Sequence, residues 1–313
     1  MKFVSFTYDD LSSIGVLNSS EIIDIHLLSD KEIPDNMLEY LENFEFNNNK
    51  LKKLLSTKVI SKDICYNIND VFLNAPLPNP PSFRDAYAFR KHVEAGRKNR
   101  GLDMIPEYDD FPVFYFSNHH SITGPGNVYV QNQYFKKLDF EFEIGAVISK
   151  RGKNIKSSDA INYIAGFMIL NDWSERDVQL KEMKLNLGPA KGKDFATSVG
   201  PWLVTLDELE DAKVIQDDGP RFDLNMRGYI NENLVSEDNF KNMTWSFSDI
   251  IERASSGVEL YPGDIIGSGT CSTGCLLELN LTNKNEYWLK EGDVIKLEVE
   301  NLGILSNTIC LNK

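Results

Sequence analysis

Acidic and apolar residues alternate one by one over residues 139–144, Asp-Phe-Glu-Phe-Glu-Ile. On a β-strand this alternation places Asp139, Glu141 and Glu143 on one face and the three apolar residues on the other. Neighbouring carboxylates repel one another unless a cation lies between them, and oxygen ligands suit Mg²⁺, Ca²⁺ or Mn²⁺ better than zinc. The alternative is an antiparallel strand with one face in water, and this stretch taken alone favours that alternative.

A second acidic element follows a buried strand. Residues 164–170 form an apolar run that leads directly into residues 171–179, Asn-Asp-Trp-Ser-Glu-Arg-Asp-Val-Gln. Polar residues at the end of an apolar strand are a common place for an active site, because a rigid element positions them. Together, the two acidic elements favour a metal site over a solvated strand.

Composition narrows the class of protein. The chain has 313 residues, enough for one large domain or two unequal ones, and its net charge of −14 disfavours nucleic acid and anionic membranes as partners. Cys271 and Cys275 complete no zinc pattern and are expected to be small buried thiols. No apolar run approaches the ~20 residues of a membrane helix, and the first residues do not read as a signal peptide. The protein is therefore expected in the cytoplasm.

The N-terminal part is expected to form a small β-rich domain. Short strands are predicted at residues 3–6, 14–17 and 21–25, and a helical stretch from about 35 to 55, broken by three asparagines at 47–49. Residues 76–81 contain four prolines, which excludes a helix or an inner strand. This linker predicts two domains, residues 1–75 and 76–313.

The larger domain is expected to be rich in short strands. Residues 84–100 have helical spacing and include Asp85, Tyr87 and His92, with Asp85 near the predicted helix start. Strands or turn-to-strand units are predicted at residues 113–116, 164–170, 229–234, 261–270 and 291–295. Many short strands and few helices indicate an α+β chain dominated by a rolled antiparallel sheet.

Five blocks of residues, taken in order, resemble the fumarylacetoacetate hydrolase family. They are Asp85-Ala86-Tyr87 with His92, and residues 139–143, 171–179, 193–197 and 267–270. The resemblance covers the chain from about residue 80 to the C-terminus, and the order of the blocks makes chance similarity improbable. It implies the family's mostly antiparallel β-roll with a small N-terminal β-rich domain, and a homodimer formed through the large domain.

The resemblance also implies a divalent metal, Mg²⁺ or Ca²⁺ with Mn²⁺ as a further alternative. Four carboxylates partly neutralised by one such ion need neither soft ligands nor a redox metal. Lys193 and Thr197 match positions beside a second cation or an ordered solvent network. For Asp85 the alternative is a helix N-cap, and for Asp172 a turn residue. The implied ligands are Asp85, Glu141, Glu143 and Asp172.

His92 is the candidate catalytic base, and Glu278 resembles the glutamate that pairs with it in the family. A carboxylate that holds one ring nitrogen leaves the other free to take a proton from water. Arg176, Gln179 and Lys193 match positions that hold an oxyanion, which suits cationic and amide donors. The alternative for Arg176 is an ion pair with Asp177 or Glu175.

The implied substrate contacts are Tyr87, Tyr115, Gln179, Met183 and Thr270. Two departures from the family pattern concern the acidic ends of the substrate. Met183 stands where fumarylacetoacetases carry a tyrosine, and Arg97 or Arg100 would have to replace their carboxylate-binding arginine. A methionine cannot donate a hydrogen bond and suits a hydrophobic or variable group, so tolerance of acylpyruvates without a second carboxylate is expected.

The chemistry implied by the resemblance is hydrolysis of a carbon–carbon bond in a 1,3-diketo acid, by addition of a water activated by His92 and departure of a metal-stabilised enolate. Fumarylacetoacetate is the first candidate substrate, which would place the enzyme in tyrosine catabolism. Acylpyruvate hydrolysis, or decarboxylation or isomerisation of an oxo-diacid, is the alternative within the family. A catalytically silent metal-binding protein is the alternative from another class.

Overall fold

A twelve-stranded sheet joins the N-terminal strands to the rest of the chain in the computed structural model, which describes residues 1–98, 101–216 and 219–312. Its strand order is β4-β3-β2-β1-β15-β13-β11-β21-β6-β7, with β5 paired to β1 and β8 paired to β15. The strands are β1 (Lys2–Tyr8), β2 (Leu11–Asn18), β3 (Glu21–Asp24), β4 (Cys65–Asn67), β5 (Phe72–Leu73), β6 (Phe83–Ala86), β7 (Phe114–Ser117), β8 (Ile122–Thr123), β11 (Phe142–Ile148), β13 (Ile164–Asp172), β15 (Thr197–Thr205) and β21 (Ile265–Gly267).

A second sheet of five strands has the order β19-β18-β22-β23-β9. Its strands are β9 (Gly126–Gln131), β18 (Asn225–Ile230), β19 (Asn233–Asn239), β22 (Val294–Val299) and β23 (Gly303–Asn312), and the remaining pairs are β10 (Leu138–Asp139) with β14 (Ser174–Glu175), β12 (Gly152–Lys153) with β20 (Glu259–Leu260), and β16 (Lys213–Gln216) with β17 (Gly219–Phe222). Within the described ranges every pairing is antiparallel except β15–β8, β21–β6 and β23–β9. The predicted α+β chain with a mainly antiparallel sheet is confirmed.

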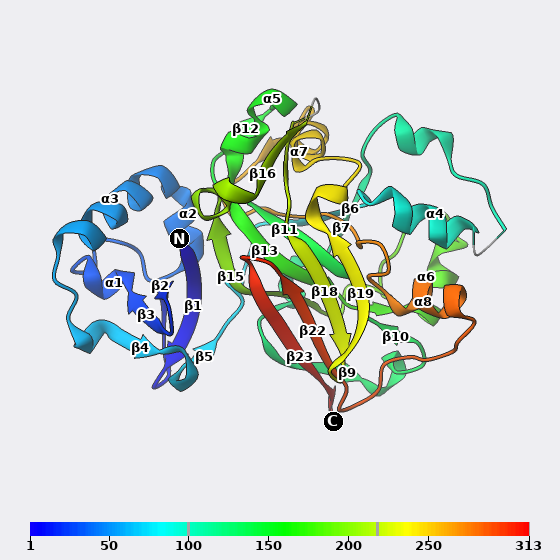
Figure 1. Ribbon diagram of the computed structural model, residues 1–313, viewed down its shortest axis with the longest axis horizontal. Helices are drawn as coiled ribbons and strands as arrows, with labels where there is room; N and C mark the ends of the chain where they lie inside the picture. The colour runs from blue at the N-terminus through cyan, green and yellow to red at the C-terminus, as the bar shows by residue number, and fades with distance from the viewer. Residues whose placement is uncertain (99–100, 217–218, 313) are drawn as a thin grey trace.

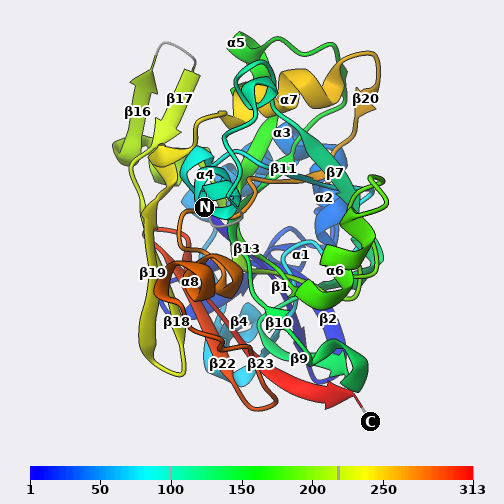
Figure 2. The same cartoon turned by 90° about the vertical axis from the view of Figure 1, so that its right-hand side faces the viewer.

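Helices are short and lie at the margins of the sheets. They are α1 (Ile25–Leu28), α2 (Met37–Glu42), α3 (Phe44–Thr57), α4 (Arg90–Lys98), α5 (Ser157–Ala160), α6 (Arg176–Met183), α7 (Phe247–Ser255) and α8 (Leu276–Asn283). Figure 1 places α1 to α3 beside the N-terminal strands at the left and α4, α6 and α8 together at the right. The view turned by 90° brings α4 and α8 to the front (Figure 2). None of the helices in the described ranges has the length and apolar character needed to cross a bilayer.

One core cluster contains residues of both sheets and is centred on aromatic packing around β13, and a second joins the other face of β13 to the N-terminal strands and helices. Phe167 on this strand contacts Phe222, Phe240 and Phe247, with ring centroids 5.1–5.2 Å away. All nine residues of β13 are buried, which explains its nearly continuous apolar sequence, because both of its faces are covered. The strand therefore delivers its polar end, at Asp172, from a rigid and fully packed element.

The N-terminal strands are confirmed, and they continue the large sheet. β1 pairs with β15 through Lys2–Val204 and Phe3–Leu203. The proline-rich stretch lies between the end of β5 at Leu73 and the start of β6 at Phe83 and forms neither helix nor strand. The domain division at residues 75 and 76 stays a prediction, as does the homodimer.

The predicted helix at residues 35–55 is interrupted, but the predicted site of the break is wrong. The chain leaves the helix at Asn43, between α2 and α3, and continues through the three asparagines. Asn47 is buried, and its side-chain amide donates to the carbonyl oxygen of Tyr40 over 2.9 Å. A tertiary hydrogen bond therefore overrides the low helix propensity of asparagine.

The helix predicted at residues 84–100 is wrong at its N-terminal end. Residues Phe83–Ala86 form β6, and the helix, α4, begins only at Arg90. β6 lies between β21 and β7, and Asp85 pairs with Gly267 on one side and Tyr115 on the other. Asp85 is therefore a strand residue and not a helix N-cap. Arg100 lies outside the described residues.

Gly166 is a test of the packing around β13. A Cβ at this position would lie 2.2 Å from the carbonyl oxygen of Val204, a backbone atom of β15 that cannot move without breaking the pairing. Gly166→Ala should lower the free energy of unfolding by about 1–3 kcal/mol or more, the range for overpacked cores. The measurement is urea denaturation followed by circular dichroism.

Gly96 provides the control for this substitution. It lies in α4, and a Cβ there would meet no heavy atom within 4 Å. Gly96→Ala should be neutral or stabilise by about 0.5–1 kcal/mol, because alanine loses less backbone entropy on folding. Equal stability of Gly166→Ala and the natural protein would show that β13 and β15 are not packed as described.

Candidate active site and metal centre

Four buried carboxylates meet across one region of the large sheet, where β13 and β11 are neighbours and β21 separates β11 from β6. One oxygen of each lies within 4.8 Å of one oxygen of every other. β6 supplies Asp85, β11 supplies Glu143, β13 ends at Asp172, and Glu141 lies in the link between β10 and β11. Oxygen-only donors in this number suit a hard divalent cation. The residues present therefore fit the metal that the sequence implies.

Asp139 does not belong to this cluster, although alternation along one strand predicts that it shares a face with Glu141 and Glu143. The acidic stretch is divided between β10, which ends at Asp139, and β11, which begins at Phe142. The strand pairing is interrupted between Asp139 and Phe142, where the backbone N–H of Glu141 donates to Asn171 Oδ1 over 3.0 Å. The period of two is lost at this irregularity, so the three carboxylates do not share a face. The stretch is also buried throughout, which excludes the strand with one face in water.

Glycines make room for the carboxylates. A Cβ on Gly267 would lie 2.4 Å from Asp85 Oδ1 and 3.0 Å from Glu143 Oε2, so a side chain at this position would displace the Asp85 carboxylate. The backbone N–H of Gly269 donates to the same two oxygens, over 3.2 and 3.1 Å. Glu143 Oε1 is buried and has no hydrogen-bond partner among the described residues. A buried carboxylate oxygen without a hydrogen-bond donor fits a metal ligand, because a bound cation would satisfy that oxygen.

Three donors surround Asp172. The hydroxyl of Tyr115 donates to Oδ2 over 2.5 Å, Lys193 Nζ lies 2.8 Å from the same oxygen, and Thr197 Oγ1 lies 3.4 Å from Oδ1. Lys193 also forms a short ion pair with Glu141. Lys193 and Thr197 therefore lie against the carboxylates. The second cation or solvent network that the family resemblance implies beside them stays a prediction.

The electrostatics of the cluster call for additional positive charge. Burial, followed by the charge of Asp172, raises the pKa of Asp85 to about 7. Burial and Asp85 raise the pKa of Glu143 well above its usual range. Burial also opposes ionisation of Glu141, but Lys193 and Arg176 outweigh it and lower its pKa to about 2. Lysine and arginine thus neutralise one side of the cluster, and the side formed by Asp85 and Glu143 needs a further cation to stay ionised.

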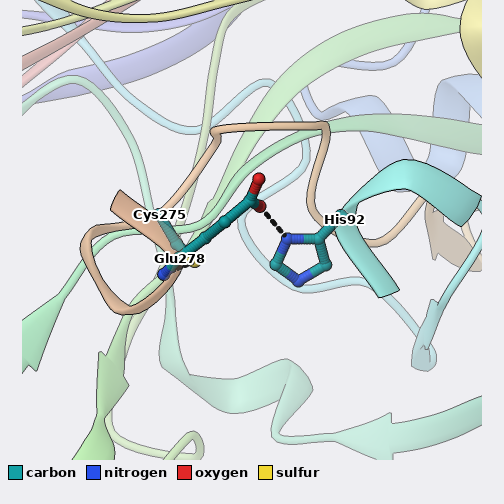
Figure 3. Close-up of side chains that lie close together, drawn as sticks. All are labelled: His92, Cys275 and Glu278. Atoms are coloured by element: carbon teal, nitrogen blue, oxygen red, sulfur yellow. Dashed lines mark hydrogen bonds and ion pairs between the residues drawn. The ribbon is translucent and has the colours of Figure 1, made fainter. Parts of the chain in front are cut away.

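His92 and Glu278 form a second group, and their side chains point toward one another (Figure 3). They come from α4 and α8, and Nδ1 of the histidine lies 2.6 Å from Oε2 of the glutamate. The other carboxylate oxygen accepts the backbone N–H of Thr273 over 3.1 Å. Glu278 is thereby held at both oxygens, and Nε2 of His92 is left to exchange a proton. The imidazole is near enough to help lower the pKa of Glu141.

Cys275 lies against this pair and could complete a three-residue metal group with it. Its thiol is buried, and burial followed by the charge of Asp139 raises its pKa well above the usual value. A thiol must lose its proton to bind a metal, and Nδ1 of His92 is already occupied by Glu278. The geometry therefore favours a histidine–carboxylate pair over a metal site. Cys271 and Cys275 are buried free thiols, as the sequence predicts.

The candidate oxyanion donors are Arg176, Gln179 and Lys193, and they differ in how far their donor groups already have partners. Arg176 Nη1 donates to Gln179 Oε1 over 2.8 Å and forms an ion pair with Glu141 Oε1 over 2.8 Å, while Nη2 is buried and has no partner among the described residues. The alternative that pairs Arg176 with Asp177 or Glu175 is wrong, because its ion pairs are with Asp139 and Glu141. Nη2 of Arg176 is thus the donor most available to a ligand.

The candidate substrate contacts differ in their exposure and in the groups that they touch. The Tyr87 ring packs edge-on against His92 with centroids 5.9 Å apart, and Thr270 is buried just beyond β21. Tyr115 is bound to Asp172, and burial raises the pKa of its hydroxyl well above the usual value. Met183 is the last residue of α6 and is 47% exposed. Its role, like the roles of the other site residues, stays a prediction.

Sequence analysis missed the backbone donors of the site. The N–H groups of Gly269 and Thr273 hold ligands and base in place, and neither carries a side-chain signal for that role. The glycine-rich block at residues 267–270 was the only available signal. Arg97, the candidate for binding a substrate carboxylate, donates from Nε to the backbone oxygen of Asp103.

Comparison with known proteins identifies a family model described as "Fumarylacetoacetate (FAA) hydrolase C-terminal", which matches residues 82–310. The fumarylacetoacetase of Arabidopsis thaliana is 30% identical over 68% of this chain, but the match spans 63% of that protein's length. The mitochondrial oxaloacetate tautomerase fahd2 of Xenopus laevis is 28% identical over 99% of this chain and 90% of its own length.

Among solved structures, maleylpyruvate hydrolase from Sphingobium sp. SYK-6, crystallised with manganese(II) and pyruvate, superposes with a TM-score of 0.73. The superposition covers all of both chains at 21% sequence identity. At this identity the similarity shows the fold, which agrees with the β-roll that the sequence implies.

The carboxylate cluster predicts a measurable metal affinity. Glu143→Ala should weaken binding of Mg²⁺ and Mn²⁺ strongly, because it removes a buried oxygen that has no donor among the described residues and leaves the ion under-coordinated. Titration calorimetry on chelator-treated protein measures the affinity. The control is Asp223→Asn, which changes an exposed carboxylate paired with Lys241. Unchanged affinity in Glu143→Ala would place the metal elsewhere.

Proposed function

This chain belongs to the fumarylacetoacetate hydrolase family, and from that premise we propose that it is a metal-dependent hydrolase of a carbon–carbon bond in a 1,3-diketo acid. The family contains hydrolases and isomerases. The observation that carries the choice of hydrolysis is the pair of His92 and Glu278, joined over 2.6 Å beside the carboxylate cluster. Water addition to a carbonyl requires a base with a free nitrogen at that place.

The cation is proposed to be divalent, with Asp85, Glu141, Glu143 and Asp172 as its ligands. When bound, it would polarise the carbonyl oxygens of a diketo acid and stabilise negative charge on them. Mn²⁺ joins Mg²⁺ and Ca²⁺ as a serious candidate, because the maleylpyruvate hydrolase of the same fold was crystallised with manganese and pyruvate. Oxygen ligands alone do not distinguish these ions.

The protein's own residues transfer the proton and stabilise the negative charge that develops. Nε2 of His92 accepts a proton from water while Glu278 holds Nδ1 and stabilises the imidazolium that forms. The resulting hydroxide adds to one carbonyl, and Nη2 of Arg176 is placed to donate to the oxygen that becomes negative. When the carbon–carbon bond breaks, the imidazolium returns the proton to the leaving carbon. Burial of the cluster strengthens each of these charge interactions.

A second candidate is tautomerisation of an oxo-diacid such as oxaloacetate. The observation that favours it is the Xenopus laevis oxaloacetate tautomerase, whose match extends over 99% of this chain and 90% of its own length. Both reactions move a proton on a 2-oxo acid, but tautomerisation does not need a base that activates water. Only hydrolysis adds water and cleaves the carbon chain, and product identification therefore separates them.

A substrate panel tests the proposed function. We expect fumarylacetoacetate and neutral-tailed acylpyruvates to be cleaved in the presence of Mg²⁺ or Mn²⁺, and the neutral-tailed ones to be accepted because Met183 offers no hydrogen bond to a second carboxylate. Loss of enol–diketone absorbance reports turnover, and mass spectrometry identifies the products. Conversion of oxaloacetate enol to ketone, with no cleavage of any diketo acid, would establish the tautomerase instead.

Replacement of the base gives a second test. His92→Ala should lower kcat by roughly 10²–10⁴-fold, the usual contribution of a positioned base, and should leave metal affinity nearly unchanged. His120→Ala is the matched control, because His120 is exposed and its ring packs against the neighbouring His119 ring. A fall in metal affinity that parallels the fall in kcat would make His92 a ligand.

A further inference from the structure

Asp139 is a fully buried carboxylate that touches both halves of the site without belonging to either. It lies at the end of β10 and does not belong to the carboxylate cluster that contains Glu141. We propose that Asp139 is a positioning residue that fixes the start of helix α8, and with it Glu278 and His92, relative to the carboxylate cluster. The kinetic part of this inference rests on the proposed function, whereas the geometric part does not.

The first turn of α8 depends on Asp139 for its hydrogen bonds. The backbone N–H of Leu276 donates to Oδ1 over 2.7 Å, and that of Leu277 donates to Oδ2 over 3.0 Å. N–H groups in the first turn of a helix have no partner within the helix, and a buried one must find an acceptor elsewhere. A carboxylate is the strongest acceptor available and also complements the positive end of the helix dipole.

The helix has no comparable cap of its own. Its N-cap residue is Cys275, whose sulfur accepts the N–H of Glu278 over 3.5 Å. Sulfur is a weak acceptor, so the N-cap alone holds the turn poorly. Glu278 follows Leu277 directly in the chain, and its carboxylate reaches His92 from this turn. The position of the base pair therefore depends on an acceptor supplied from β10.

The other contact of Asp139 leads to the metal site. Oδ2 accepts from Nε of Arg176 over 2.7 Å, and Nη1 of the same guanidinium lies 2.8 Å from Glu141 Oε1. Arg176 is itself buried, so its charge is balanced by these two carboxylates. Asp139 thus links the helix that carries Glu278 to the arginine that holds Glu141. One side chain sets the spacing between the base and the cation ligands.

An amide cannot replace this carboxylate. Asparagine has one acceptor oxygen and one NH₂ donor, and the three groups around Asp139 are all donors. In Asp139→Asn at least one N–H would face another donor, and Arg176 would lose half of its compensation. We expect the first turn of α8 to shift, and a shift on the scale of 1 Å at a catalytic group costs on the order of 10²-fold in rate.

The test uses the full chain, labelled with ¹⁵N in its four histidines and loaded with Mg²⁺. The ring-nitrogen signals of His92 are assigned by their loss in His92→Ala. In Asp139→Asn the Nδ1 signal should move towards the position of a solvent-exposed histidine, because the hydrogen bond to Glu278 is weakened. Asp24→Asn is the matched control, since Asp24 is a buried aspartate that accepts the N–H of Leu27 at the start of α1, in the N-terminal part of the chain.

Kinetics on any substrate that the panel identifies provide a second measurement. Asp139→Asn should lower kcat about 10²-fold with KM little changed, and should lower it far less when His92 is already alanine, because both changes act through the same base. Equal losses in both backgrounds would overturn the proposal, since they would show a general effect on folding. If no substrate is turned over, the proposed function fails, and the NMR result still decides the role of Asp139.

An unchanged His92 signal in folded Asp139→Asn would also overturn the proposal. If that variant is not recovered in folded form, Asp139→Glu replaces it. Glutamate keeps the charge but places its oxygens one methylene farther from the backbone, so the Nδ1 signal of His92 should still move. An unmoved signal in Asp139→Glu would mean that the first turn of α8 is held by other contacts.

Discussion

Mutual repulsion of four buried carboxylates is the constraint on which the site depends. Their oxygens lie within 4.8 Å of one another, and burial removes the water that would otherwise screen them. Lys193 and Arg176 neutralise the side at Glu141, but Glu143 keeps an oxygen without a donor among the described residues. A divalent cation would remove this repulsion, and the strands packed around β13 position the carboxylates that would hold it.

Glycines and backbone N–H groups also help to hold the carboxylates in place. Gly267 leaves space that any side chain would fill, and Gly269 donates to two of the carboxylates. Thr273 does the same for Glu278 on the side of the base. These contacts place the site at the crossing of strands and short loops, where backbone geometry is fixed by pairing.

The proposed base and the proposed cation ligands come from separate elements, so the structure must fix their relative position as well as the position of each. Helices α4 and α8 bring His92 and Glu278 together, whereas strands bring the carboxylates together. Asp139 and Arg176 form the buried connection between these two groups. Hydrolysis and tautomerisation place different demands on that spacing, because only hydrolysis requires a water between the base and the carbonyl.

The sequence alone determined the α+β class, the N-terminal strands and the family, since these follow from local alternation, turn residues and the order of short blocks. It also named Asp85, Glu141, Glu143, Asp172, His92 and Glu278, through that resemblance. Only the tertiary structure decided that Asp85 lies on a strand and that Asp139 turns away from its neighbours. In both cases a contact with a residue distant in the sequence, Gly267 or Arg176, outweighs the local preference, and no window of neighbouring residues contains that contact. The break after Glu42 depends on a nearer contact, from Asn47 to Tyr40, which forms only when α2 and α3 pack together.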